Sequence, residues 1–228
     1  MARDNHPRIR QERELVRKKG KRAPFDRVLI VCEGSKTEPN YFNDIRTAFR
    51  LPWANVQVQP SEYGTSPLQV AQYAHDLFMK GDRHRRIPAK GFDQVFVVFD
   101  RDDHLQYHDA LALVKACDKK HRNDTKTATP FHAIASVPCF ELWMLLHFED
   151  VHASLHRDEV MRRLKGHLPA YAKGAAGVFM LTRSHLEGAL QRAERLAQSH
   201  TAHEDNGPFT AVHELVALLV GFSREGGK

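Results

Sequence analysis

Short runs of apolar residues alternate with amphipathic stretches through the first part of the chain. Residues 27–32, 94–99 and 131–135 are largely apolar and rich in β-branched or aromatic side chains. Such runs are typical of strands that are buried on both faces of a parallel sheet. Residues 55–60 alternate between polar and apolar and end at Pro60, which indicates an edge strand or a half-exposed strand. The pattern therefore predicts a mainly parallel four-stranded sheet.

Helical periodicity fills the segments between these strands. Ser35 and Glu38 have the spacing of a capping box, and the apolar positions that follow predict a helix as far as Phe49. A second and a third helix are expected at 66–81 and at about 106–120. After the last strand the pattern is helical, with helices expected at 138–148, about 157–166, 183–199 and 209–222.

This order of elements indicates an α/β fold with a C-terminal helical annex. We expect an α/β domain at 23–136 and a helical extension at 137–228 that packs on it. Residues 1–22 form a basic, flexible arm with nine Lys or Arg against three Asp or Glu, and nine minus three is the whole net charge of +6. The arm is either merely solvated or binds phosphates without sequence preference, and composition leaves both alternatives open.

Composition and cysteine usage exclude several classes of protein. No run of eighteen or more apolar residues is present, which argues against a transmembrane helix and a membrane partner. The basic N-terminus lacks the apolar run of a secretory signal. Cys32, Cys117 and Cys139 are widely spaced, and no His/Cys cluster has the spacing of a zinc motif. We therefore expect a soluble cytoplasmic protein with reduced thiols.

Acidic residues follow two of the predicted strands directly. Glu33 follows the first, and Asp100, Asp102 and Asp103 follow the strongest. Ligands of open parallel sheets bind beyond the carboxyl ends of the strands, and Asp100 and Asp102 would point to the same side of an extended segment. Oxygen ligands on one face favour Mg²⁺ or Mn²⁺. Each acid also has a simpler explanation, because Glu33 could belong to a helix-entry turn and Asp102 or Asp103 could cap the next helix.

Three further residues are candidates for the same site. Glu141 lies in a helix that is apolar nearly all round, so its carboxylate must be paired with a basic group, placed at a helix N-terminus or bound to the metal. Lys36 and Lys173 are candidates to stabilise negative charge in a transition state. His104 and His147 could be ligands or proton carriers, although histidines near helix ends are more often structural.

The acidic pattern resembles the TOPRIM fold of topoisomerases, bacterial primases and OLD-type nucleases. The resemblance rests on Glu33-Gly34 after the first strand and on Asp100-Arg-Asp102 after the third, and it covers about residues 26–136. It implies a TOPRIM-like sheet in which Glu33 is the general acid or base. By the same resemblance, Asp100 and Asp102 are the Mg²⁺ ligands.

A narrower resemblance extends over nearly the whole chain. The stretches 33–42, 100–103 and 138–143 are similar to the RloB-like family, a TOPRIM branch of bacterial restriction and abortive-infection loci, and 206–213 resembles its C-terminal Thr-x-x-His element, with Pro208-Phe209 where Pro-Ser is more usual. The resemblance implies a Mg²⁺-dependent nuclease in anti-phage defence that cleaves DNA or RNA, with tRNA among the candidates. It also implies a companion ATPase encoded separately, in agreement with the absence of a G-x-x-x-x-G-K-[ST] motif.

Two other functions compete with a nuclease. The first is another TOPRIM reaction, either primer synthesis or strand breakage and rejoining, but rejoining needs a nucleophilic tyrosine in a cleavage domain for which the chain has little room. The second is a non-catalytic, nucleic-acid-binding regulator with a relic acidic site. The sequence leaves open the trigger of activity, one metal ion or two, and whether the chain forms a homo-oligomer.

Overall fold

The computed structural model describes residues 25–102, 104–203 and 207–225. The basic arm at 1–22 and Asp103 therefore lie outside the described residues. The described part contains no helix that is both long enough and apolar enough to cross a membrane.

A five-stranded sheet forms the centre of the molecule, with the strand order β2-β1-β3-β4-β5. The strands are β1 (Val28–Cys32), β2 (Val56–Pro60), β3 (Gln94–Asp100), β4 (Phe131–Val137) and β5 (Phe209–Thr210). The first four are parallel, and β5 is antiparallel to β4. Every residue of β1 is buried, as its continuous apolar run predicts. The mainly parallel α/β sheet expected from the sequence is confirmed.

The fifth strand is a difference from the four-stranded expectation. Residues 209–210 were expected to begin the last helix, but they pair with Ser136 and Val137 of β4. The hydroxyl groups of Ser136 and Thr210 lie 3.2 Å apart. Two residues are too few to show a strand periodicity, so this strand depends on pairing with a distant segment.

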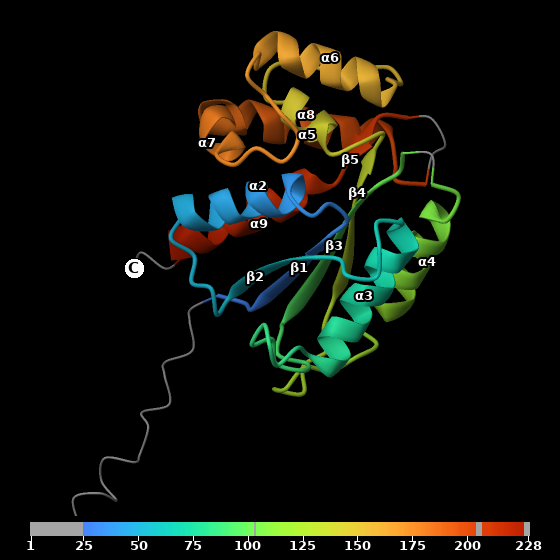
Figure 1. The fold of residues 1–228 in the computed structure, drawn as a ribbon, viewed down its shortest axis with the longest axis vertical. Helices are drawn as coiled ribbons and strands as arrows, with labels where there is room; N and C mark the ends of the chain where they lie inside the picture. Colours follow the sequence, from blue (N-terminus) through green and yellow to red (C-terminus); the bar gives the residue numbers. More distant parts are fainter. Residues whose placement is uncertain (1–24, 103, 204–206, 226–228) are drawn as a thin grey trace, which may run out of the picture.

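Helices cover both faces of the sheet (Figure 1). On one face lie α2 (Thr37–Ala48) and α9 (Val212–Glu225), which contact each other. On the other face lie α3 (Pro67–Lys80) and α4 (Tyr107–Cys117), which also contact each other. The helix α9 thus belongs to the layer that covers the sheet, although it comes from the C-terminal part of the chain.

The remaining helices lie together beyond the carboxyl ends of the parallel strands, at the top of Figure 1. They are α5 (Glu141–Leu145), α6 (Arg157–His167), α7 (Val178–Thr182), the short 3-10 helix Arg183–His185 and α8 (Leu186–Ser199). The helix expected at 138–148 is the five-residue helix α5. The helix α7 was not expected from the sequence. All five residues of α5 are buried, so this short helix is stabilised by packing against its neighbours rather than by a long run of helical hydrogen bonds.

One predicted helix cap is wrong. The helix α2 begins at Thr37, and its N-cap residue Lys36 makes no capping bond through its side chain. The Ser35–Glu38 capping box does not form, because Ser35 lies one residue before the N-cap position. The predicted start of α3 is confirmed, since Ser66 and Gln69 form a capping box there.

Candidate functional site

The two acidic strand ends meet because their strands are neighbours. β1 pairs with β3 in parallel, and the backbone N–H of Glu33 donates to the carbonyl oxygen of Val98 at 2.9 Å. The Glu33 carboxylate in turn accepts a hydrogen bond of 2.9 Å from the backbone N–H of Asp100. The Glu33 side chain, directly after β1, is therefore held against the end of β3.

A cavity of about 280 Å³ opens above these strand ends. Segments far apart in the sequence contribute to it: the β1–α2 loop, the end of β3, the first residues of α5 and α6, and the loop before α7. Five carboxylates line it, together with three basic side chains: Glu33, Glu38, Asp100, Asp102 and Glu141, with Lys36, Arg157 and Lys173. Five minus three leaves a formal charge of −2 when every group is ionised, which one divalent cation would balance.

Glu38 is a site residue that the sequence analysis missed. Its side chain is only 7% exposed, and its Oε2 atom has no hydrogen-bond partner among the described residues. The residue at position 34 must be small for this arrangement, because a Cβ atom on Gly34 would collide with the Glu38 carboxylate. The signal was present in the sequence, since Glu38 lies on the same helical face as the apolar residues Tyr41, Phe42 and Ile45. A carboxylate on a buried face needs a partner.

Asp102 reaches the cavity in a way that differs from the prediction. The segment 100–102 is not extended throughout, because Asp102 has a positive φ of 36°, a region that Asp tolerates better than most residues. The backbone N–H of Asp102 donates to Pro138 O at 3.1 Å. Arg157, another residue missed from sequence, donates to its Oδ2 at 2.7 Å, whereas its Oδ1 is buried without a partner among the described residues. The N-cap residue of α4 is Gln106, which makes no capping bond through its side chain, so Asp102 is not the N-cap; Asp103, the other predicted cap, lies outside the described residues.

Glu141 is at the cavity and is also paired. Its carboxylate lies 3.3 Å from the Lys173 ammonium group and accepts a hydrogen bond of 3.3 Å from the Tyr171 hydroxyl group. Both partners come from the loop before α7, which is docked on the start of α2 by two hydrogen bonds of Gly174, one to Thr37 and one from Asn40. The sequence left open whether Glu141 forms an ion pair or belongs to the acidic site. In the structure it does both, because it pairs with Lys173 and lines the cavity.

Of the other residues predicted from sequence, Lys36 and His104 lie at the cavity and His147 lies in the core. Lys36 is exposed at the rim of the cavity. The His104 ring nitrogen Nε2 lies 3.4 Å from Glu33 Oε1, close enough to exchange a proton with it. His147 instead packs against Trp143, and burial lowers its pKa to about 4. His147 therefore has a structural role.

Burial and mutual repulsion raise the pKa values of the clustered carboxyl groups. The pKa of Glu33 rises to about 7, mainly because burial disfavours the charged form and then because Glu38 and Asp102 are close. The pKa of Asp100 rises well above its ordinary value through burial and the neighbouring Glu38, Glu33 and Glu141. Burial is also the main cause of the raised pKa values of Glu38 and Asp102. In the absence of a cation, the cluster therefore holds protons near neutral pH.

Comparison with known proteins identifies one family. The family described as RloB-like protein matches residues 28–219, a range that contains every residue lining the cavity. The search of curated proteins and the search of solved structures each returned no match.

Proposed function

Because the chain belongs to the RloB-like family, we propose that it is a Mg²⁺-dependent nuclease, active also with Mn²⁺, that hydrolyses phosphodiester bonds of DNA or RNA in anti-phage defence. The observation that carries this proposal is the convergence of five carboxylates on one cavity at the carboxyl ends of β1 and β3. Structural carboxylates are normally paired, and here only two of the five have a Lys or Arg partner in an ion pair within the described residues.

The donor set fits a hard divalent cation. Glu38 Oε2 and Asp102 Oδ1 are buried carboxylate oxygens without a hydrogen-bond partner among the described residues, and leaving such oxygens unpartnered is unfavourable. Oxygen ligands from carboxylates, completed by water and phosphate, are those that Mg²⁺ prefers. We propose Asp100, Asp102 and Glu38 as its principal ligands, with Glu33 and Glu141 at the margin of the shell. A bound Mg²⁺ ion would supply charge stabilisation to the phosphate and acidify a bound water.

The chain's own groups divide the remaining tasks. Glu33, with a pKa of about 7, is suited to accept a proton from an attacking water near neutral pH. His104, 3.4 Å from that carboxylate, is placed to pass the proton to solvent. Arg157 and Lys173 hold Asp102 and Glu141 in place by ion pairs, and with Lys36 they provide cations for the non-bridging oxygens of a phosphate in the cavity.

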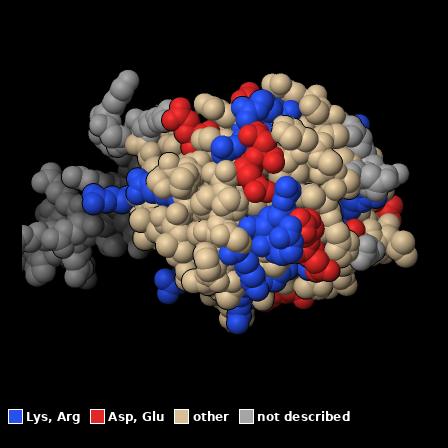
Figure 2. Space-filling view, turned by 90° about the horizontal axis from the view of Figure 1, so that it is seen from above, with Lys and Arg blue, Asp and Glu red and all other residues tan. Residues whose placement is uncertain are grey.

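We propose nucleic acid as the substrate, held mainly by the site and by the basic arm. Figure 2 shows the molecule from above, over α6, where Lys and Arg side chains gather beside Asp and Glu. Arg162 pairs with Glu159, and Arg163 lies 3.2 Å from Glu149. This face is therefore of mixed charge, and it offers less general attraction to phosphates than a purely basic surface would. The separately encoded ATPase remains part of the proposal on the strength of the family resemblance.

A cleavage assay tests the proposal directly. Purified chain is incubated with labelled DNA, total RNA or tRNA in Mg²⁺, in Mn²⁺ or in EDTA, and we expect cleavage products only with a divalent ion. Asp100→Asn should abolish cleavage, whereas Asp109→Asn, which changes an exposed aspartate on α4, should leave it intact. Nucleic-acid binding without cleavage of any substrate, with or without the ATPase, would instead support a non-catalytic regulator.

A further inference from the structure

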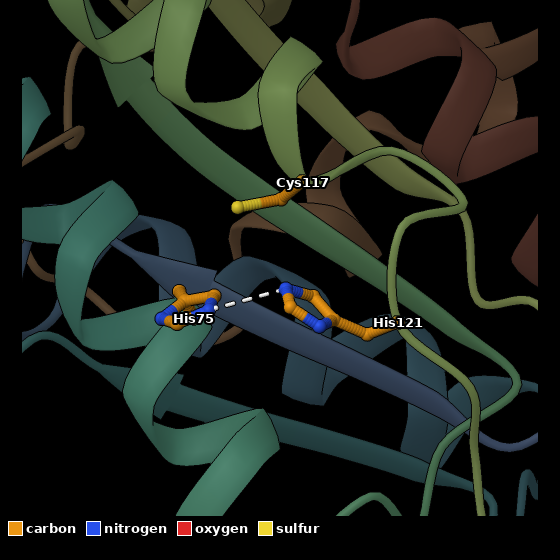
Figure 3. A group of neighbouring side chains, drawn as sticks. All are labelled: His75, Cys117 and His121. Atoms are coloured by element: carbon orange, nitrogen blue, oxygen red, sulfur yellow. Dashed lines mark hydrogen bonds between the residues drawn. The ribbon is translucent and has the colours of Figure 1, made fainter.

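A second group of chemically reactive side chains lies on the sheet face opposite α2, away from the acidic cavity (Figures 1 and 3). It consists of His75 in the middle of α3, Cys117 at the end of α4, and His121 in the following loop. Figure 3 shows the three side chains pointing toward one another from these separate segments. The Cys117 sulfur and one ring nitrogen from each histidine all lie within 4.8 Å of one another.

The spacing of these atoms resembles that of metal ligands. The two Nε2 atoms of His75 and His121 lie 3.2 Å apart. Two imidazole nitrogens bound to one tetrahedral Zn²⁺ ion, at about 2.05 Å each, are separated by about 3.3 Å. A thiolate at about 2.3 Å from the same ion would lie about 3.6 Å from each nitrogen. The cluster thus needs only small side-chain movements to enclose an ion.

The surroundings of His75 favour the same interpretation. Its other ring nitrogen, Nδ1, lies 3.3 Å from a carboxylate oxygen of Asp76. A carboxylate in this position holds the proton on Nδ1 and leaves the Nε2 lone pair for a metal, as in the carboxylate–histidine–zinc arrangement.

We propose that His75, Cys117 and His121 form a Zn²⁺ site. A borderline-soft ion is preferred here because the ligands are imidazole and thiol, a set that Mg²⁺ avoids. A cavity of about 290 Å³, lined by His75, Asp76 and Cys117 among others, adjoins the cluster and gives room for a water molecule as fourth ligand. Bound Zn²⁺ would tie α3 to the end of α4 and to the loop that leads into β4. This site is independent of the proposed nuclease activity.

Cobalt substitution tests the proposal on the untagged full-length chain. Co²⁺ bound to a thiolate gives a charge-transfer absorption band that carboxylate ligands do not give, so an ion held only by the carboxylates of the acidic cavity does not contribute to it. We expect the metal-free chain to bind one Co²⁺ with this band, and excess Zn²⁺ but not excess Mg²⁺ to remove it. Zn²⁺ should also raise the Tm of the chain, because it binds only the folded state.

Variants then assign the band to its ligands. Cys117→Ser should remove the charge-transfer band, His121→Gln should weaken Co²⁺ binding at least tenfold, and His84→Gln, which changes an exposed histidine in the α3–β3 loop, should leave both unchanged. The wild-type chain alone can overturn the proposal: absence of a thiolate band at saturating Co²⁺ would show that the cluster holds no metal. Persistence of the band in a folded Cys117→Ser variant would place the thiolate elsewhere and overturn it equally.

Discussion

At the scale of single residues, the carboxylates of the acidic cavity have lost water without each gaining a protein cation. Glu38 shows this most clearly, because its carboxylate is buried, has an unpartnered oxygen within the described residues and lies near Glu141. Such a group destabilises the metal-free fold, and as a ligand of the proposed Mg²⁺ site it would stabilise the metal-bound one. Removing its charge should therefore have opposite effects on the two forms.

We expect Glu38→Gln and Asp100→Asn to raise the stability of the metal-free chain at neutral pH by on the order of 1 kcal/mol, since each replaces a carboxyl group that must take up a proton on folding, or stay charged beside other acids, with a neutral amide. The same variants should lose most of the increase in Tm that Mg²⁺ gives to the wild-type chain. Thermal unfolding in EDTA and in Mg²⁺ measures both effects. The matched variants are Asp109→Asn and Glu187→Gln, which change exposed acids. A variant of the cavity that is destabilised in EDTA and still responds fully to Mg²⁺ would contradict the metal site.

Glu33 predicts a specific dependence of stability on pH. Its pKa is about 7 in the folded chain against an ordinary value of 4.5, so between these values the folded state holds a proton that the unfolded state has released. The stability contributed by this group is therefore complete below pH 4.5 and is lost as the pH rises toward 7. The loss amounts to about 3 kcal/mol at most.

Chemical denaturation in EDTA between pH 4.5 and pH 8 measures this loss, and Glu33→Gln should remove it while Glu187→Gln should not. The affinity for Mg²⁺ should rise over the same pH range, because a proton on Glu33 competes with the ion. Identical pH profiles for the wild-type chain and Glu33→Gln would show that Glu33 does not titrate in this range.

The positions of some site residues could be predicted from sequence because they depend on strand ends. Glu33, Asp100 and Asp102 follow buried strands, and parallel neighbours bring such positions together. Arg157 could not be assigned in the same way, because α6 brings it to the cavity only through packing between distant segments. Glu38 was missed for another reason, since its signal is its place on the buried face of α2 rather than a strand end.

At the scale of elements, the β1–α2 loop controls the place of the Glu38 carboxylate. Gly34 has no unusual φ, and the need for glycine there comes from the lack of room for a Cβ atom against Glu38. The atom that would have to move is at the end of a flexible side chain, so Gly34→Ala should reduce stability by about 1 kcal/mol or less. It should nevertheless displace the carboxylate and weaken Mg²⁺ binding several-fold. Calorimetric titration with Mg²⁺ measures this affinity.

The matched variant is Gly166→Ala, which adds a methyl group at an exposed position of α6 with nothing within 4 Å. This change should leave Mg²⁺ binding unaltered and add up to about 1 kcal/mol of stability, since Ala is the better helix former. Equal Mg²⁺ affinities for Gly34→Ala and Gly166→Ala would show that Glu38 is not a ligand.

The lengths of helices and strands were predicted well where a long apolar pattern marks the element. They were predicted poorly where contacts with distant segments determine whether the element forms. The helix α3 has a capping box and a clear apolar stripe, and its start at 67 follows from sequence. The two-residue strand β5 and the five-residue helix α5 have no local signal of their own. For the same reason the cluster of His75, Cys117 and His121 forms no recognisable zinc motif, because its ligands come from three segments.

At the scale of the whole molecule, charge is divided unevenly along the chain. Residues 1–22 carry +6, and residues 23–228 hold 25 basic and 25 acidic residues, since 34 minus 9 and 28 minus 3 are both 25. The face seen in Figure 2 is correspondingly mixed in sign. If the proposed function is correct, a formally neutral body with a basic arm would assign general attraction to nucleic acid to the arm and hydrolysis at one phosphate to the body.

Deleting residues 1–22 should therefore weaken nucleic-acid binding without removing any residue proposed for catalysis. The slope of log K against log salt concentration should become less steep by about 0.9 for each duplex phosphate contact that the arm makes. Binding measured across a salt series gives this slope, and cleavage at saturating substrate should remain at the wild-type rate. An arm of the same length with its nine Lys and Arg residues changed to Gln separates charge from length, and it should behave like the deletion. An unchanged salt slope in both variants would show that the arm does not contact phosphates, and the attraction would then have to come from the body alone.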